Sequence, residues 1–404
     1  MAPPRMPRPK LFLVGGPSGA GKDALLTGAR EKAVDVAFVI RDVTRAADQC
    51  SALERSVSSD DFATGDYALR WSAHGTTDYG IPSKALEEAL AAGRTIVLNV
   101  SRGTFAEARE KYSDRADVYV LLVTASREAL RERLTARARD GDDAEARLKR
   151  ATAYAPPDAR FWPVVRIRND KSLAEGVDRF VSALERPAAF CVPVVGLVGC
   201  SASGKSTLCA ELPAAAVVAA YDFYKPRDAC PRFDLAADIR WPGGVPDAFQ
   251  ERGNADLNHP DSVDWAACAD AVDAAVDKIV DAGGGGVVVV EGLLLLGAGA
   301  ERVRDRCAQL VLLDDGYDDP AKQEVLWRRK WTRSGHLGKE SYKARGVTAD
   351  EYEAYWGYVS RRWKEHGLDR IEAAGRPIHR VDAHADDRSA QVEALLRSSA
   401  LINT

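Results

Sequence analysis

Short apolar runs alternate with longer amphipathic segments along the whole chain, a pattern that predicts strands alternating with helices. In the first half, strands are expected at 36–40, 95–99, 118–123 and 164–168, and helices at 83–92, 104–112 and 127–139. In the second half, strands are expected at 217–220, 287–290, 310–313 and 378–381, and helices at 265–282, 320–331 and 349–365. This alternation favours an α/β fold in which each parallel sheet carries helices on both faces.

Two glycine-rich segments, each directly after an apolar run, suggest a repeat on the scale of a whole domain. The run 11–14 leads into Gly-Pro-Ser-Gly-Ala-Gly-Lys-Asp at 16–23, and the run 194–198 leads into Gly-Cys-Ser-Ala-Ser-Gly-Lys-Ser-Thr at 199–207. The expected helix 173–184 ends before Arg186-Pro187, where a new apolar strand is about to begin. We therefore expect two tandem domains, 1–186 and 187–404. The glycines at 283–286 are expected to form a turn from a helix into a strand.

The spacing GxxxxGK[ST] between a strand and a helix is typical of a phosphate-binding loop, or P-loop. Its glycines let backbone N–H groups surround phosphate oxygens at the positive end of the helix. The lysine reaches the β- and γ-phosphates, and the hydroxyl that follows it binds Mg²⁺. The sequence therefore predicts ATP and Mg²⁺ as cofactors, whereas the plain alternative is a glycine-rich turn with a chance lysine. The predicted nucleotide-binding residues are Gly16, Ser18, Gly19, Gly21, Lys22 and Asp23 in the first loop, and Gly199, Ser201, Ser203, Gly204, Lys205, Ser206 and Thr207 in the second.

The first loop departs from the pattern, because Asp23 stands where the hydroxyl of Ser206 stands in the second loop. A carboxylate at that position is able to bind Mg²⁺ directly, so Asp23 and Ser206 are both predicted metal ligands. Lys22 and Lys205 are the predicted catalytic cations of the two loops.

Arginines are placed to gather anionic substrates in the first half. Arg41, Arg45 and Arg102 come just after predicted strand ends, where open α/β sheets bind ligands. Further arginines flank the acidic stretch 140–143, which we interpret as a lid over the phosphates; they are Arg133, Arg137, Arg139 and Arg147. For any single one of them, a solvated helix face is an equally good interpretation.

On these residues, the first half resembles ribose 1,5-bisphosphate phosphokinase, a branch of the guanylate-kinase-like group that carries the same aspartate after the loop lysine. Other matching positions are Thr44, Trp71, Gly75, Tyr79, Gly80, Asn99, Ser101, Asn169 and Asp170. The resemblance implies conversion of ribose 1,5-bisphosphate and ATP to 5-phosphoribosyl diphosphate and ADP. It also implies substrate contacts from Arg41, Arg45, Tyr79, Arg102 and Arg147, and a catalytic role for Arg137.

Two alternatives remain open for the first half. A guanylate kinase would carry Ser or Thr at position 23 and an acid at the end of the third strand, where this chain has Asp23 and Asn99. Our hypothesis is that the carboxylate has moved from one side of the metal to the other. The second alternative is a binding module that has lost catalysis.

In the second half, two carboxylates stand at strand ends. Asp222 follows the expected strand 217–220 and is able to accept a proton from an attacking hydroxyl. Glu291 closes the run of valines at 287–290, a usual position for a carboxylate that contacts Mg²⁺ or its waters.

These features, with Tyr224, His259-Pro260-Asp261 and a basic stretch at 328–333, resemble the uridine kinase and nicotinamide riboside kinase group over 192–382. The resemblance implies a nucleoside-like acceptor, with Arg328 as a catalytic residue and Arg329 and Arg333 in a lid over ATP. It implies acceptor contacts from Tyr224, Asp261 and Asp264. Asn258 replaces an acid that relatives often carry, and the insert 227–254, with Trp241, is long enough to form part of the acceptor pocket.

Composition narrows the partners. The chain is 404 residues long, with 29% charged residues and a formal net charge of −4, so nothing in the totals points to a nucleic-acid partner. The two resemblances imply small-molecule phosphate acceptors. No apolar run approaches the roughly 20 residues of a membrane helix. Seven scattered cysteines favour free thiols, and we expect a cytoplasmic protein, with organellar targeting left open. The oligomeric state is not predicted.

Overall fold

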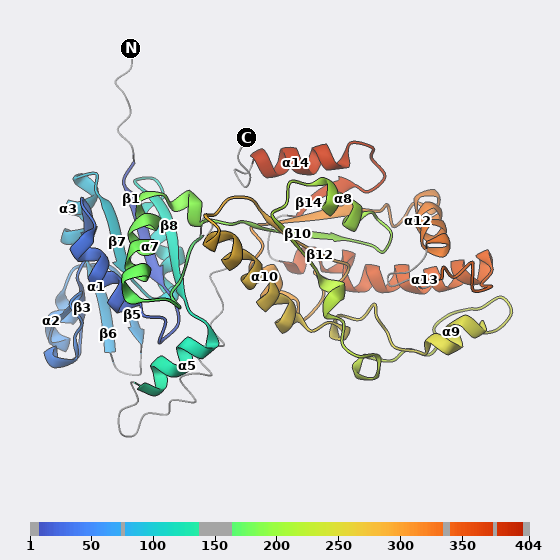
Figure 1. Ribbon diagram of the computed structural model, residues 1–404, viewed down its shortest axis with the longest axis horizontal. Helices are drawn as coiled ribbons and strands as arrows, with labels where there is room; N and C mark the ends of the chain where they lie inside the picture. The colour runs from blue at the N-terminus through green and yellow to red at the C-terminus, as the bar shows by residue number, and fades with distance from the viewer. Residues whose placement is uncertain (1–7, 74–76, 137–163, 334–339, 375–377, 399–404) are drawn as a thin grey trace, which may run out of the picture. The chain divides into compact units, whose positions relative to one another are not determined.

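The computed structural model describes residues 8–73, 77–136, 164–333, 340–374 and 378–398, which form two compact units (Figure 1). The division falls between Cys191 and Val192, and the short segment 280–285 groups with the first unit. Each unit has its own parallel sheet and its own buried core.

The first unit is built around a five-stranded sheet in the order β2-β7-β1-β8-β9, with every neighbouring pair parallel. Its strands are β1 (Lys10–Gly15), β2 (Val36–Phe38), β7 (Thr95–Asn99), β8 (Asp117–Thr124) and β9 (Val164–Arg168). Leu11 and Leu13 of β1 share one core with α3 (Ser83–Ala91) and α4 (Phe105–Tyr112). Since side chains alternate along a strand, Phe12 and Val14 point to the opposite face. On the described part of the chain, α1 (Lys22–Lys32) packs against α7 (Leu173–Glu185), and α5 spans Arg127–Ala136.

A second sheet in the first unit was not predicted from the sequence, which indicated a single parallel sheet. Its order is β4-β3-β6-β5, with β3 and β4 parallel and the other pairs antiparallel. The strands β3 and β4 are only three residues long, too short to give a period-2 signal. The bounds are β3 (Arg41–Val43), β4 (Glu54–Ser56), β5 (Tyr67–Ala73) and β6 (Thr77–Pro82), with α2 (Ser59–Thr64) between β4 and β5.

The second unit repeats the topology of the parallel sheet, in the order β11-β12-β10-β13-β14. Numbered in chain order within each unit, both parallel sheets run 2-3-1-4-5. The strands are β10 (Val194–Gly199), β11 (Ala216–Ala219), β12 (Val288–Gly292), β13 (Gln309–Asp314) and β14 (Ile378–Asp382). The strand that precedes the glycine-rich loop is therefore central in both sheets.

Helices cover the second sheet on both sides. α8 (Lys205–Glu211) packs against α14 (Arg388–Ser398), and α10 (Trp265–Asp281) and α13 (Ala349–His366) lie on the other side of the strands in Figure 1. α12 (Pro320–Thr332) packs against α13, and the insert carries the short helix α9 (Asp247–Arg252). No helix among the described ranges is both long and apolar enough to cross a membrane.

Most predicted elements match the structure to within one or two residues. The expected strands 95–99 and 164–168 coincide with β7 and β9. The expected helix 127–139 corresponds to α5, whose described part ends at Ala136. All seven cysteines are free thiols.

Candidate active sites

Both glycine-rich segments fold as tight loops between the central strand and a helix. Gly21 and Gly204 stand immediately before α1 and α8 with φ of 87° and 94°, a left-handed conformation in which glycine is not strained. A Cβ atom on Gly16 would lie 2.2 Å from the carbonyl oxygen of Val123. The glycines of the motif are thus required by backbone shape, and each loop places its free N–H groups at the N-terminus of a helix.

The two loop lysines make matching contacts. Lys22 Nζ donates to the carbonyl oxygens of Gly16 at 2.7 Å and Pro17 at 3.0 Å. Lys205 Nζ donates to those of Gly199 and Cys200, both at 2.9 Å. Burial lowers the pKa of Lys22 to about 8, although Asp23 acts in the opposite direction. Burial also lowers the pKa of Lys205.

A polar pair lies beside each loop, formed by the residue after the lysine and the residue at the end of the neighbouring strand. In the first unit, Asn99 Nδ2 donates to Asp23 Oδ1 at 3.1 Å. In the second, Ser206 Oγ donates to Glu291 Oε2 at 3.1 Å. Asn99 is paired with Val14, two residues before Gly16, and Glu291 with Leu197, two residues before Gly199. The two pairs are therefore equivalent in the fold, with the carboxylate on opposite members.

The donor atoms of these pairs suit Mg²⁺, which prefers oxygen ligands. Asp23 supplies a carboxylate, and Asn99 retains its amide oxygen while its nitrogen donates to Asp23. Ser206 and Glu291 supply a hydroxyl and a carboxylate. Both sites thus present one carboxylate and one neutral oxygen.

The back of the first loop is supported by Asn169, which is 5% exposed. Its Nδ2 donates to the carbonyl oxygen of Ala20 at 2.8 Å, and a Cβ atom on Gly21 would lie 2.4 Å from this nitrogen. Arg133 Nη2 donates to the carbonyl oxygen of Asn169 at 2.6 Å. Asn169 therefore holds the loop backbone in place, and Arg133 in turn binds the backbone of Asn169.

Arg41, Arg45 and Tyr79 are brought together on the small sheet. The guanidinium carbons of Arg41 and Arg45 lie 5.0 Å and 5.8 Å from the centre of the Tyr79 ring. Trp71 stacks on Tyr79 with ring centroids 5.5 Å apart. Arg41 Nη1 also donates to the carbonyl oxygen of Asn99 at 3.0 Å, which places this cluster next to the Asp23–Asn99 pair.

Sequence reasoning missed Glu54, which binds both arginines of this cluster. Its carboxylate accepts hydrogen bonds from Arg41 at 2.6 Å and 3.1 Å and forms an ion pair with Arg45. No motif marks Glu54; only the pairing of β4 with β3 brings it opposite Arg41. Arg102, another predicted substrate residue, is exposed on the 3-10 turn Arg102–Thr104. The remaining predicted residues of the first unit lie outside the described residues; they are Arg137, Arg139, Arg147 and the acidic stretch 140–143.

In the second unit, the loop opens onto a cavity of about 450 Å³. One wall carries the predicted residues Lys205, Ser206, Glu291, Tyr224 and Arg333. Other lining residues were not predicted. Those from α13 and the segment before it include Tyr342, Arg345, Tyr352, Tyr355 and Trp356. The glycine-rich loop and a set of aromatic side chains therefore share one cavity.

Several predicted residues of the second unit do not line this cavity. Asp264 Oδ1 accepts a hydrogen bond from the N–H of Ala267 at the start of α10, which is a helix-capping contact. Asp261 is exposed, 3.7 Å from His259 Nδ1. Arg328 pairs with Glu324 on the exposed side of α12. Three further predicted residues are exposed and do not line the cavity: Thr207, Asp222, and Arg329 of α12.

Asp222 nevertheless lies at the expected edge, in the 3-10 turn Ala220–Phe223 directly after β11. β11 pairs with β12, and Ala219 is opposite Glu291. Asp222 thus follows the end of β11, and Glu291 is the last but one residue of the neighbouring β12. Tyr221, next to Asp222, lines the cavity.

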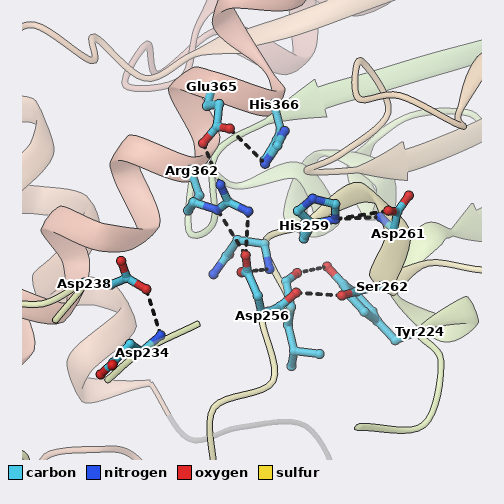
Figure 2. Close-up of polar contacts among 12 residues, drawn as sticks. Tyr224, Asp234, Asp238, Asp256, His259, Asp261, Ser262, Arg362, Glu365 and His366 are labelled. Carbon is cyan, nitrogen blue, oxygen red and sulfur yellow. Dashed lines mark hydrogen bonds and ion pairs between the residues drawn. The ribbon is translucent and has the colours of Figure 1, made fainter. Parts of the chain in front are cut away.

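A largely buried ion pair joins Asp256 to Arg362 of α13 (Figure 2). Asp256, 2% exposed, accepts hydrogen bonds from Arg362 Nη2 at 2.7 Å and Nε at 3.0 Å. Asp256 also accepts from the N–H of Asn258, which lines the cavity. The acidic residue near the His259 segment is therefore Asp256, two residues before Asn258, and it is bound by Arg362 of α13. Trp241 is packed 4.9 Å from Phe249 and does not line the cavity.

A strand, a glycine-rich loop with a half-buried lysine, and a helix at the central position of a 2-3-1-4-5 parallel sheet define the first unit as a P-loop kinase. A family model described as an AAA domain matches residues 11–157. The chain belongs to the ribose 1,5-bisphosphate phosphokinase family, since it is 45% identical over 157 residues to ribose 1,5-bisphosphate phosphokinase PhnN of Rhodopseudomonas palustris. That alignment covers 36% of this chain and 77% of the relative. The predicted ATP-dependent phosphotransferase is thereby confirmed.

Other relatives agree. The enzyme of the same name from Acidiphilium cryptum is 43% identical over 159 residues, covering 38% of this chain and 84% of that protein. A bifunctional ribose 1,5-bisphosphokinase-thymidine phosphorylase of Cupriavidus necator is 37% identical over 193 residues, covering 44% of this chain and 31% of that protein.

Among solved structures, a guanylate kinase from Anaplasma phagocytophilum is 19% identical and covers 45% of this chain and 87% of its own, with a TM-score of 0.32. A similarity this low carries no argument about function. The resemblance of the second half to nucleoside kinases stays a prediction.

Proposed function

We propose that the chain is a bifunctional kinase. The first unit transfers the γ-phosphate of ATP to the 1-phosphate of ribose 1,5-bisphosphate, and the second transfers it to a hydroxyl of a nucleoside-like acceptor of the uridine or nicotinamide riboside type. The observation that supports both activities most strongly is the repeated arrangement of a half-buried loop lysine beside a 3.1 Å pair of one carboxylate and one neutral side chain.

For the first unit, the arrangement of cations suits transfer between two phosphates. An oxygen of the acceptor phosphate attacks the γ-phosphorus, the bond to the β–γ bridging oxygen breaks, and ADP leaves. Because the attacking phosphate is already anionic, no general base is needed. What the reaction needs is neutralisation of the gathered negative charge, for which Lys22 stands on the nucleotide side and Arg41 and Arg45 on the acceptor side.

Asp23 and Asn99 are the proposed holders of Mg²⁺ in the first unit. The ion would supply charge neutralisation at the β- and γ-phosphates. The side chain of Asn99 orients the Asp23 carboxylate through a 3.1 Å hydrogen bond. The backbone carbonyl oxygen of Asn99 accepts a hydrogen bond from Arg41. The residue at the end of β7 thus connects the metal side of the site to the acceptor side.

For the second unit, the aromatic cavity supports a flat acceptor. Tyr224, Tyr355 and Trp356 line it together with Lys205 and Glu291 of the phosphate end. Aromatic walls of this kind bind bases by stacking. Asp222 is the proposed general base, which accepts the proton of the attacking hydroxyl, and Ser206 and Glu291 are the proposed metal residues.

The test is release of ADP by the purified chain with a panel of acceptors: ribose 1,5-bisphosphate, GMP, uridine, cytidine and nicotinamide riboside. Activity on ribose 1,5-bisphosphate should disappear with Lys22→Ala and survive Lys205→Ala. Activity on one nucleoside should behave in the opposite way. If Lys22→Ala changes nothing on any acceptor, the first unit is a binding module joined to a single kinase. If GMP alone depends on Lys22, the first unit is a guanylate kinase.

A further inference from the structure

We infer that Glu54 is a positioning residue, which holds Arg41 and Arg45 together as a binding site for the acceptor phosphate. The inference deepens the proposed function of the first unit and rests on it. It assigns the specificity of this site for a phosphate group to a carboxylate that itself touches no substrate.

Each oxygen of the Glu54 carboxylate serves one of the arginines. Oε1 accepts from Arg41 Nε at 3.1 Å and Nη2 at 2.6 Å. Oε2 pairs with Arg45 Nη2 and accepts the backbone N–H of Ser51 at 2.8 Å. The side chain of Glu54 is 1% exposed, so the carboxylate is enclosed by these donors and is not itself open to a ligand.

The arrangement leaves donors for an incoming anion. A guanidinium group has five N–H donors, and Arg41 directs three of them to Glu54 and to the carbonyl oxygen of Asn99. Arg45 binds Glu54 through Nη2, and its side chain remains 28% exposed. Two cations this close repel each other, and the carboxylate between them offsets that repulsion while keeping a net positive charge at the site. A phosphate group, which accepts several charge-assisted hydrogen bonds, matches the remaining donors.

The position of the arginines is fixed from two further sides. Both lie over the face of Tyr79, which is 4% exposed, and Arg41 is held to the end of β7 beside Asp23. The paired guanidinium groups therefore face the phosphate-loop side of the small sheet. That is where the acceptor oxygen has to meet the γ-phosphate.

The same two strands provide a matched control on their other face. In the ladder of β3 and β4, Arg41 is opposite Glu54 and Asp42 is opposite Arg55. Asp42 is also buried, at 3% exposure, and accepts two hydrogen bonds from Arg55, both at 2.8 Å. Because side chains alternate across a strand, this second pair points away from the arginines of the site.

The experiment compares Glu54→Gln with Asp42→Asn. Both substitutions keep the shape of the side chain and remove one buried carboxylate from a pair. We expect Glu54→Gln to raise KM for ribose 1,5-bisphosphate on the order of tenfold or more, as for other residues that orient binding groups, with little change in KM for ATP. Asp42→Asn should lower the melting temperature and leave both KM values unchanged. Equal KM values for the acceptor in the two variants would overturn the inference.

A binding measurement separates this inference from the proposed activity. If the wild-type chain does not phosphorylate ribose 1,5-bisphosphate, the proposed activity fails. The inference is then tested by titrating inorganic phosphate calorimetrically into the chain with saturating ADP and Mg²⁺, with Arg41→Ala to identify binding at this site. Weaker phosphate binding in Glu54→Gln than in Asp42→Asn supports the role of Glu54, and equal binding refutes it.

Discussion

Asn99 donates its side-chain amide to the carboxylate of Asp23 at 3.1 Å, at the place where Ser206 donates to Glu291 in the second unit. The fold position, the distance and the number of carboxylates are the same, and only the order of acid and neutral partner is reversed. Each unit therefore keeps one negative charge beside its loop lysine.

This reversal predicts that the pair can be exchanged as a whole. Asp23→Ser alone should lower kcat for ribose 1,5-bisphosphate on the order of 100-fold, because the metal that Asp23 is proposed to hold stabilises the transition state by several kcal/mol. Asp23→Ser combined with Asn99→Asp should recover part of that loss by restoring one carboxylate. Steady-state kinetics of both variants provide the test, and a double variant no better than Asp23→Ser would refute the exchange.

The low pKa of Lys22 predicts an alkaline limit for the first activity. In the free protein, burial lowers the pKa of Lys22 to about 8, so its charge is lost as pH rises through 8. Since only the charged form attracts the phosphates, kcat/KM for ATP in the ribose 1,5-bisphosphate reaction should fall above pH 8, and this ratio reports groups of the free enzyme.

Lys22→Arg serves as the control for this profile, because a guanidinium stays charged over the whole range. The variant should be less active, and its kcat/KM should no longer fall near pH 8. A fall at the same pH in Lys22→Arg would assign the transition to another group.

The two loops also differ in backbone strain. Ala202 has a φ of 65° at the position equivalent to Gly19, whose φ is 86°. A left-handed conformation costs a non-glycine residue roughly 1–2 kcal/mol, so Ala202→Gly should stabilise the second unit by about 1 kcal/mol. Calorimetry should show its melting temperature rising by about 2–4 °C.

The reverse change tests the same reasoning in the first unit. Gly19→Ala should destabilise it, both through φ and because the new Cβ would lie 3.1 Å from Leu134 Cγ. A melting temperature that falls in Ala202→Gly, or rises in Gly19→Ala, would contradict the assignment of strain to this position.

His366 predicts acid sensitivity of the second unit. It is 7% exposed on α13, where burial and then the charge of Arg362 lower its pKa below 6.5 (Figure 2). A lowered pKa means that the unfolded chain binds the proton more readily. The free energy of unfolding should therefore fall as pH drops below about 6.5, by at most about 1.4 kcal/mol per pH unit from this group.

Urea unfolding at pH 7.5 and pH 5.5 measures this effect. His366→Gln should reduce the difference between the two pH values, since the side chain no longer titrates. An undiminished difference in His366→Gln would show that His366 is not the source of the acid sensitivity.

Features whose conformation is set by residues adjacent in the chain could be predicted from the sequence. The two loops, their lysines and the strands before them are specified by contiguous residues, and the apolar runs of β7 and β9 are long enough to show their period. Asn99 and Glu291 were found because an isolated polar residue at the end of a buried strand is conspicuous.

Residues whose roles depend on pairing between distant segments were missed. Glu54 gains its partners only when β4 lies beside β3, and these strands are too short to be recognised. The tyrosines of α13 follow an ordinary amphipathic pattern, so nothing in the sequence separates a cavity wall from a core. Asp264 was predicted to contact the acceptor, and the structure shows it capping α10; a helix start and a ligand-binding carboxylate have the same local sequence.

The contacts of Lys22 and Lys205 with their own loop carbonyls carry a consequence for the arrival of ATP. Each ammonium group is already ordered at the centre of its loop, so little side-chain entropy remains to be lost when the nucleotide binds. The phosphate groups of a ligand must instead replace two carbonyl oxygens as partners of the lysine. A ligand with a single phosphate makes few contacts that offset this loss. A triphosphate reaches the surrounding N–H groups as well, so we expect each loop to discriminate between ligands by the length of the phosphate chain.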